Sequence, residues 1–164
     1  MHGIKGIKEL SFRSFFSDNR GEFYEIWNNE SLKKKNFEPK EVSFVRPKKN
    51  ALRGYHGDKK TKKIIVLVSG IFFISFIDPR KNSITYGKNF SVKINSNKNK
   101  KIFFLSEGIG NAYAALSDNC TYIYLQNQIY GKNNQFTISY KDNFYDVKWP
   151  KRKYIISKRD QINE

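Results

Sequence analysis

The sequence predicts an all-β protein, a sandwich or barrel of the jelly-roll type with one or two short helices. Many short runs are rich in β-branched and aromatic residues, and Gly, Asn, Asp and Ser separate them at a spacing typical of sandwiches and barrels. One stretch, 29–36, has a convincing helical pattern. A chain of 164 residues fits one domain with a proper core, so we expect a single jelly-roll domain over 1–164.

The order of the elements follows from these runs and their breaks. Gly21 gives the chain the freedom to turn between the second and third runs. The helix at 29–36 has Ser31 as a candidate N-cap and ends before Pro39. Strands are expected at 7–12, 15–22, 23–27, 42–45, 64–68, 71–77, 88–94, 101–104, 112–116, 121–125 and 136–140.

Composition limits the compartment and the partners. Cys120 is the single cysteine and excludes an intramolecular disulfide, and no apolar stretch resembles a secretory signal or is long enough to span a bilayer. We therefore expect a cytoplasmic protein without a membrane partner. The formal charge of +16 favours an anionic partner. Charge alone does not distinguish nucleic acid, a membrane surface and a nucleotide diphosphate.

The stretch LRGYHGD at 52–58 holds the one histidine outside the first few residues, His56. An imidazole takes a proton near pH 7 without large retuning, so His56 is the candidate base. In a regular strand Arg53 and His56 would point to opposite faces, unless Gly54 and Gly57 bend the chain. A histidine beside glycines is also common in turns and cores, so the residues alone leave a structural role open.

A metal site is not expected. Barrel metal sites of the transition-metal kind need two or three histidines with a carboxylate, and this chain offers His56 and the isolated Cys120. The chemistry is therefore expected to use side chains alone.

A series of motifs runs in order along nearly the whole chain. They are DNRGEFYE (18–25), LRGYH (52–56), Lys63, Gly70, DPRKNSITYG (78–87), SEGIGN (106–111), Tyr130, VKWP (147–150) and SKRD (157–160). This order resembles the dTDP-4-dehydrorhamnose 3,5-epimerases and their relatives that act on nucleotide-linked 4-keto sugars. The resemblance implies a cupin-like jelly roll, a homodimer, no cofactor, and a His–Asp pair that works opposite a tyrosine.

The resemblance also implies catalytic roles. His56 falls on the base, Asp160 on the carboxylate that orients it, and Tyr130 on the acid. Taking a proton from the carbon beside a ketone produces an enolate, so such a site needs a base, a proton donor on the other face and positive charge near the oxygen. Without the resemblance, Tyr130 would be assigned to strand packing and Asp160 to a solvated tail.

Substrate-binding positions follow from the same resemblance. Lys63 falls near the sugar oxygen, and Arg53 lies beside the diphosphate and the sugar. Three more residues fall on nucleotide-contacting positions, where the family often builds the site across the dimer interface; they are Arg20, Phe23 and Glu25.

Departures from the pattern bear on the substrate. Asn111 stands where the dTDP-rhamnose enzymes have a second histidine, and it can hold a hydrogen bond but cannot carry a proton. The segment before Arg53 is shortened to 46–50. With Gly57 and Asp58, these features resemble the branch that acts on GDP-linked 4-keto heptoses in capsule synthesis, whose members invert C3 or both C3 and C5.

Other functions remain open at this point. One alternative is a dTDP-4-keto-6-deoxyhexose 3,5-epimerase or 3,4-ketoisomerase, or an epimerase that has lost activity. Another is a basic barrel that binds nucleic acid, which would need solvent-facing aromatics among its Lys and Arg residues. The runs at 103–104 and 122–124 are expected to turn into the core instead. A nucleotide-diphosphate sugar is therefore the expected partner, and nucleic acid is not.

Overall fold

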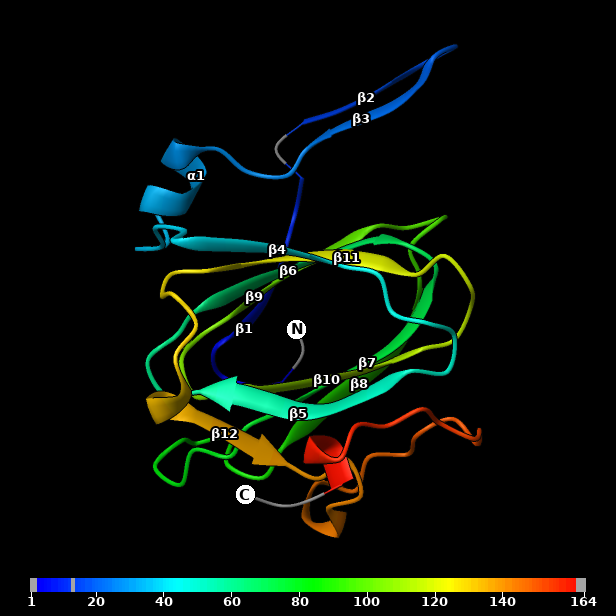
Figure 1. Cartoon of the computed structure of the whole chain (residues 1–164). Coiled ribbons are helices and arrows are strands. Elements are labelled where there is room, and N and C mark those ends of the chain that lie inside the picture. The colour runs from blue at the N-terminus through cyan, green and yellow to red at the C-terminus, as the bar shows by residue number, and fades with distance from the viewer. Residues whose placement is uncertain (1–2, 13, 162–164) are drawn as a thin grey trace.

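The computed structural model describes residues 3–12 and 14–161. Two five-stranded antiparallel sheets lie face to face, with strand orders β1-β9-β6-β11-β4 and β12-β5-β10-β7-β8. Figure 1 shows these sheets as the upper and lower walls of a flattened barrel. The predicted all-β jelly roll is confirmed.

Most strands lie within a few residues of the expected ranges, but the strand at 52–58 was not among them. The first sheet contains β1 (Ile7–Leu10), β4 (Glu41–Val45), β6 (Lys63–Ser69), β9 (Lys101–Leu105) and β11 (Thr121–Gln126). The second contains β5 (Leu52–Asp58), β7 (Ile71–Ile77), β8 (Asn89–Asn95), β10 (Gly110–Ala115) and β12 (Gln135–Ile138). The last strand is shorter than predicted because the chain turns at Ser139, whose carbonyl accepts a hydrogen bond from Asp142 N–H at 3.1 Å.

Both faces of each sheet are covered over much of their area, which explains the nearly continuous apolar runs. Between the sheets, the core includes Leu67, Phe72, Phe76 and Phe103. On the outer face of the first sheet, a second cluster contains Leu32 of the helix. Burial therefore comes from the outer face of the first sheet as well as from the interior between the sheets.

The helix α1 (Asn29–Lys33) lies over the outer face of the first sheet (Figure 1). Its N-cap is Asn28, whose side chain accepts a hydrogen bond from Ser31 N at 3.0 Å, while Ser31 Oγ accepts from Asn28 N at 3.1 Å. Ser31 is therefore the third helical residue of a capping box, and its assignment as the cap was wrong. The helix is also shorter than predicted.

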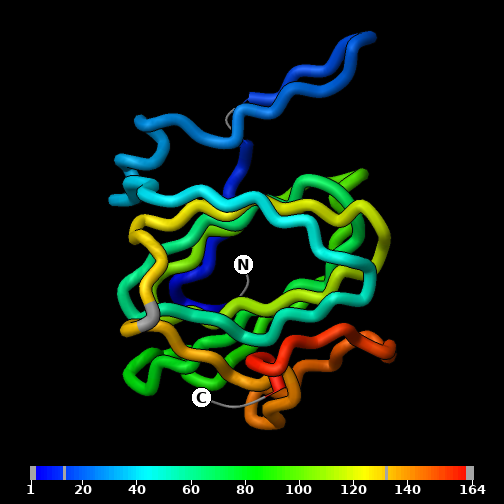
Figure 2. Tube along the Cα trace, in the orientation of Figure 1, coloured from blue at the N-terminus to red at the C-terminus, as the bar shows by residue number. Residues whose placement is uncertain are grey.

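A hairpin of β2 (Ser14–Asp18) and β3 (Gly21–Glu25) forms a separate two-stranded sheet. Figure 2 shows it leaving the barrel and extending away from it. Its large side chains are exposed, with Phe15 at 57%, Phe16 at 56% and Phe23 at 60%. So much unpartnered aromatic surface on a projecting hairpin indicates an interaction site.

The chain after β12 covers the outer face of the second sheet (Figures 1 and 2). It contains the 3-10 turns η2 (Asn143–Tyr145) and η3 (Arg159–Gln161), and η1 (Lys132–Asn134) precedes β12. Trp149 packs on Phe73 and donates its indole N–H to the Tyr140 carbonyl at 2.9 Å, and these contacts hold the segment against the sheet. This segment brings Asp160 to the barrel.

Within the described ranges, no helix has the length and apolar character needed to cross a membrane.

Candidate active site

A β-bulge in β5 places Arg53 and His56 on the same pocket. In the pairing with β10, His56 lies opposite Asn111 and Arg53 lies opposite Tyr113, so three steps along β5 match two along β10. The extra residue breaks the alternation of the strand, and both side chains line one cavity. The departure from a regular strand that Gly54 and Gly57 allow is therefore present.

His56 is paired with Asp160. The His56 Nε2 lies 2.7 Å from Asp160 Oδ1, and the two side chains are 25% and 3% exposed. Ser157 Oγ donates a hydrogen bond to Asp160 Oδ2 at 2.8 Å. A Cβ on Gly54 would lie 3.3 Å from Asp160 Oδ1, so the bare glycine leaves room for the carboxylate to reach the strand. Asp160 is thus a buried partner of the histidine and not a tail residue.

The charge on Asp160 is maintained by these contacts. Burial alone would raise its pKa, but the hydrogen bonds from His56 and Ser157 bring the pKa below its ordinary value. An ionised carboxylate only accepts hydrogen bonds, so Nε2 of a neutral His56 carries the proton and Nδ1 carries the lone pair.

The other ring nitrogen faces Thr137 on the neighbouring strand. Thr137 pairs with His56 in the sheet, and its Oγ1 lies 3.4 Å from His56 Nδ1. Arg159 Nε donates to the same Oγ1 at 3.1 Å. The imidazole is therefore held from both sides, by a carboxylate and by a hydroxyl.

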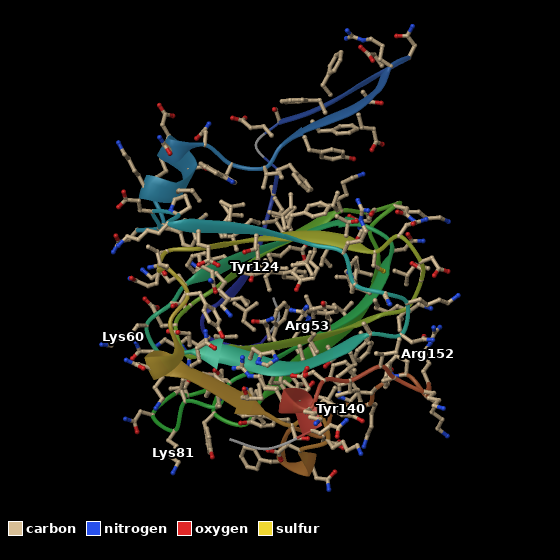
Figure 3. The ribbon with its side chains drawn as sticks, viewed as in Figure 1. Arg53, Lys60, Lys81, Tyr124, Tyr140 and Arg152 are labelled. Atoms are coloured by element: carbon tan, nitrogen blue, oxygen red, sulfur yellow. The ribbon has the colours of Figure 1, made fainter. Side chains whose placement is uncertain are left out.

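The cavity around His56 has a volume of about 230 Å³ and opens between the two sheets. Three of its lining side chains are cations, namely Arg53, Lys63 and Arg159, and none of its lining residues among those described is a carboxylate. Figure 3 shows Arg53 and Tyr124 projecting into the space between the sheets. Such a wall attracts an anion such as a diphosphate.

Several lining residues were missed by the sequence reasoning: Gly57, Ile65, Tyr113, Tyr122, Tyr124, Gln126, Gln135 and Arg159. The period-two spacing of Tyr122, Tyr124 and Gln126 on β11 was a usable signal, because alternate residues of a strand share a face. As expected, Phe103 and Phe104 are buried, so they do not form a solvent-facing aromatic platform.

Lys63 begins β6 and is half-buried in the cavity wall. Burial lowers its pKa to about 8, while the nearby Asp58 acts in the opposite direction. An ammonium with this pKa is mostly charged at neutral pH and is poorly solvated. It is well suited to a negative oxygen that develops during a reaction.

Asn111 also lines the cavity. Its Oδ1 is buried and has no hydrogen-bond partner within the described part of the chain. Buried polar atoms are normally paired, so an unpaired one in a pocket points to a ligand that supplies the partner.

Tyr130 lies at the edge of the same cavity, in the segment between β11 and η1. Its side chain is 53% exposed, and its backbone N–H donates to Glu41 Oε2 at 2.8 Å. The structure thus gathers six of the nine expected site residues: His56, Asp160, Tyr130, Arg53, Lys63 and Asn111.

The remaining three lie on or at the end of the projecting hairpin, away from this cavity. Arg20 pairs with Asp18 at 2.6 Å, and Phe23 is exposed. Glu25 accepts a hydrogen bond from Asn28 Nδ2 at 3.1 Å. They do not contribute to the pocket of their own chain.

The fold and this pocket together define a class of protein, a jelly-roll barrel with a buried histidine–carboxylate pair beside a cation-lined pocket. Comparison with known proteins agrees with that class. A sequence model of the dTDP-4-dehydrorhamnose 3,5-epimerase family matches residues 2–164. The chain belongs to this family and is an isomerase that epimerises a nucleotide-linked sugar.

Individual relatives are similar over most of their length. The dTDP-4-dehydrorhamnose 3,5-epimerase of Methanothermobacter thermautotrophicus is 31% identical over 156 residues, which cover 89% of this chain and 82% of that one. The solved structure of ChmJ, a 3'-monoepimerase from Streptomyces bikiniensis in complex with dTDP-quinovose, matches with a TM-score of 0.87 and 26% identity, covering 96% of this chain and 82% of that one. The Mycobacterium tuberculosis rmlC epimerase matches with a TM-score of 0.85 and 27% identity, covering 95% and 82%.

Proposed function

We propose that this enzyme inverts C3, or C3 and C5, of a dTDP-linked 4-keto-6-deoxyhexose without a cofactor. The observation that carries the proposal is the His56–Asp160 pair, 2.7 Å apart, in a pocket lined by three cations. The relatives are named for dTDP sugars. They do not support the GDP-linked heptose that the departures at Asn111 and 46–50 favoured.

The proposed first step is removal of the proton from the carbon beside the C4 ketone. His56 takes the proton, and the electron pair of the C–H bond moves to the C4 oxygen to form an enolate. Asp160 orients the ring and stabilises the imidazolium that results. The ammonium of Lys63 stabilises the negative oxygen, and Arg53 attracts the diphosphate.

In the second step, Tyr130 delivers its phenolic proton to the opposite face of the same carbon, and the C4 carbonyl forms again. A phenol is protonated at neutral pH, so it can serve as the donor. His56 then loses its proton to solvent and Tyr130 regains one, which returns the site to its starting state. The same cycle at C5 would give the double epimer.

The test is incubation with dTDP-4-keto-6-deoxyglucose in deuterated water, with NMR used to locate exchanged and inverted carbons. His56→Ala should abolish exchange at every reactive carbon while the fold is retained. Tyr130→Phe should still exchange deuterium with retention through His56 but should lose most of the inverted product.

Two outcomes would contradict these assignments. Exchange by His56→Ala at close to the native rate would exclude His56 as the base. Inversion by Tyr130→Phe at close to the native rate would assign the far-face proton to another group. A parallel incubation with a GDP-linked 4-keto heptose checks the substrate, because faster turnover of that sugar would contradict the proposed dTDP hexose.

We further propose that the enzyme acts as a homodimer in which the hairpin reaches the pocket of the partner subunit. The exposed Phe15, Phe16 and Phe23 support an interface, as do Val42 and Phe44, both 60% exposed on the outer side of the edge strand β4. In that arrangement Arg20 and Phe23 would contact the nucleotide bound by the partner.

A further inference from the structure

The segment that carries Tyr130 has little support from its own surroundings. Residues 128–131 are exposed, and Ile129 beside Tyr130 is 74% exposed. Exposed loops are mobile, whereas a proton donor must be held within a fraction of an ångström of its productive position. Something must therefore restrict Tyr130 if it acts as a donor.

Glu41 provides such a restraint. Its Oε2 accepts the backbone N–H of Tyr130 at 2.8 Å, across 89 residues of sequence. Hydrogen bonds to an ionised carboxylate are about twice as strong as neutral ones. Glu41 is the first residue of β4, so the bond ties the segment to the barrel wall.

The Glu41 carboxylate also lies close to a residue that lines the pocket. Gln126 lies opposite Glu41 on one side and opposite Lys63 on the other, so the three residues form one row across β4, β11 and β6. Gln126 is buried, and its Nε2 lies 3.5 Å from Glu41 Oε1. Glu41 thus connects the wall that carries Lys63 to the backbone of Tyr130.

We propose that Glu41 is a positioning residue for Tyr130: its carboxylate fixes the Tyr130 backbone, and through it the phenol, over the pocket. Glu41 acts through Tyr130 and does not touch the substrate. The inference rests on the proposed role of Tyr130 as the donor for the far face. It adds a residue that lies outside every motif in the sequence.

The experiment separates the two proton transfers. Glu41→Ala, Glu41→Gln and Glu38→Ala are incubated with dTDP-4-keto-6-deoxyglucose in deuterated water, and inverted product is compared with exchange that retains configuration. Glu41→Ala should lower inversion by about tenfold, the factor expected for loss of a charge-assisted hydrogen bond, while exchange through His56 stays within about twofold. Glu41→Gln keeps an acceptor oxygen and should restore most of the inversion. Glu38→Ala removes a nearby exposed carboxylate and should behave as the wild type.

Two results would overturn the proposal. An unchanged ratio of inversion to exchange in Glu41→Ala would show that Tyr130 needs no such restraint. An equal fall in both activities would assign Glu41 a general structural role. Tyr130→Phe is measured alongside: if it still inverts, the donor assignment itself fails, whereas if it does not and Glu41→Ala is normal, only the role of Glu41 fails.

Discussion

At the residue scale, Lys63 gives the pocket a pH dependence. Its pKa is lowered by burial to about 8, so the ammonium is present below that pH and is lost above it. Because the proposed enolate oxygen needs the positive charge, we expect kcat/KM for inversion to fall above about pH 8.

Lys63→Arg should move this fall to higher pH, because a guanidinium stays charged throughout the measurable range. A pH–rate profile of the wild type and the variant checks this, with Lys60→Arg, an exposed position, as the control. An alkaline limb at the same pH in Lys63→Arg would show that another group titrates there.

Individual site residues differ in how far the sequence could reveal them. His56 could be found from composition, since few side chains exchange protons near pH 7. No sequence pattern could identify Asp160 as the partner of His56, because it lies about a hundred residues after that histidine and in a 3-10 turn. Only the resemblance of SKRD to a family motif pointed to it. Arg159, its neighbour in that motif, was missed because a lysine-rich chain offers no way to single out one cation that lines a pocket.

At the element scale, β12 packs closely against β5, the strand that carries His56. A Cβ on Gly57 would overlap the ring of Phe136, so only a glycine allows that ring to lie on the strand. Gly57→Ala should therefore lower the free energy of unfolding by about 1–3 kcal/mol, the usual cost of overpacking. Urea denaturation measures this loss.

Phe136→Leu combined with Gly57→Ala should recover part of the stability, because the smaller side chain leaves room for the methyl group. Gly131→Ala is the matched control, since its nearest crowding atom would be 4.0 Å away. Equal stability of Gly57→Ala and the wild type would mean that the ring moves aside without cost.

Strand positions could be predicted well because both faces of the sheets are buried and the apolar runs are long. The sequence showed that a bend in β5 was possible but could not predict the bulge, since glycines permit a bend without requiring one. The projecting hairpin was not foreseen as separate from the barrel. Phe15, Phe16 and Phe23 are residues of the kind found in core strands. The sequence pattern does not show whether such residues are covered by their own chain or by another molecule.

At the scale of the whole molecule, the proposed exchange of hairpins predicts complementation. His56→Ala has an intact hairpin and a dead pocket, and Arg20→Ala has an intact pocket and an impaired hairpin. Unfolding and refolding the two together should give about a quarter of the wild-type rate, since half of the dimers are mixed and each mixed dimer has one intact site.

Size-exclusion chromatography with light scattering checks that dimers form, and each variant refolded alone is the control. A mixture no more active than the sum of its parts would mean that every pocket is built from a single chain.

The prediction of a single domain over 1–164 stays a prediction.

Because of where Asp160 lies, the barrel could stay folded while the histidine–carboxylate pair is lost. The carboxylate comes from the segment after β12, which up to residue 161 contributes no named strand to either sheet. A protease nick in that segment would leave all strands connected and the circular dichroism of the sheets nearly unchanged, yet it would release the partner of His56. With Asp160 in its proposed role, turnover is therefore a more sensitive assay of damage during purification and storage than a spectroscopic measure of secondary structure.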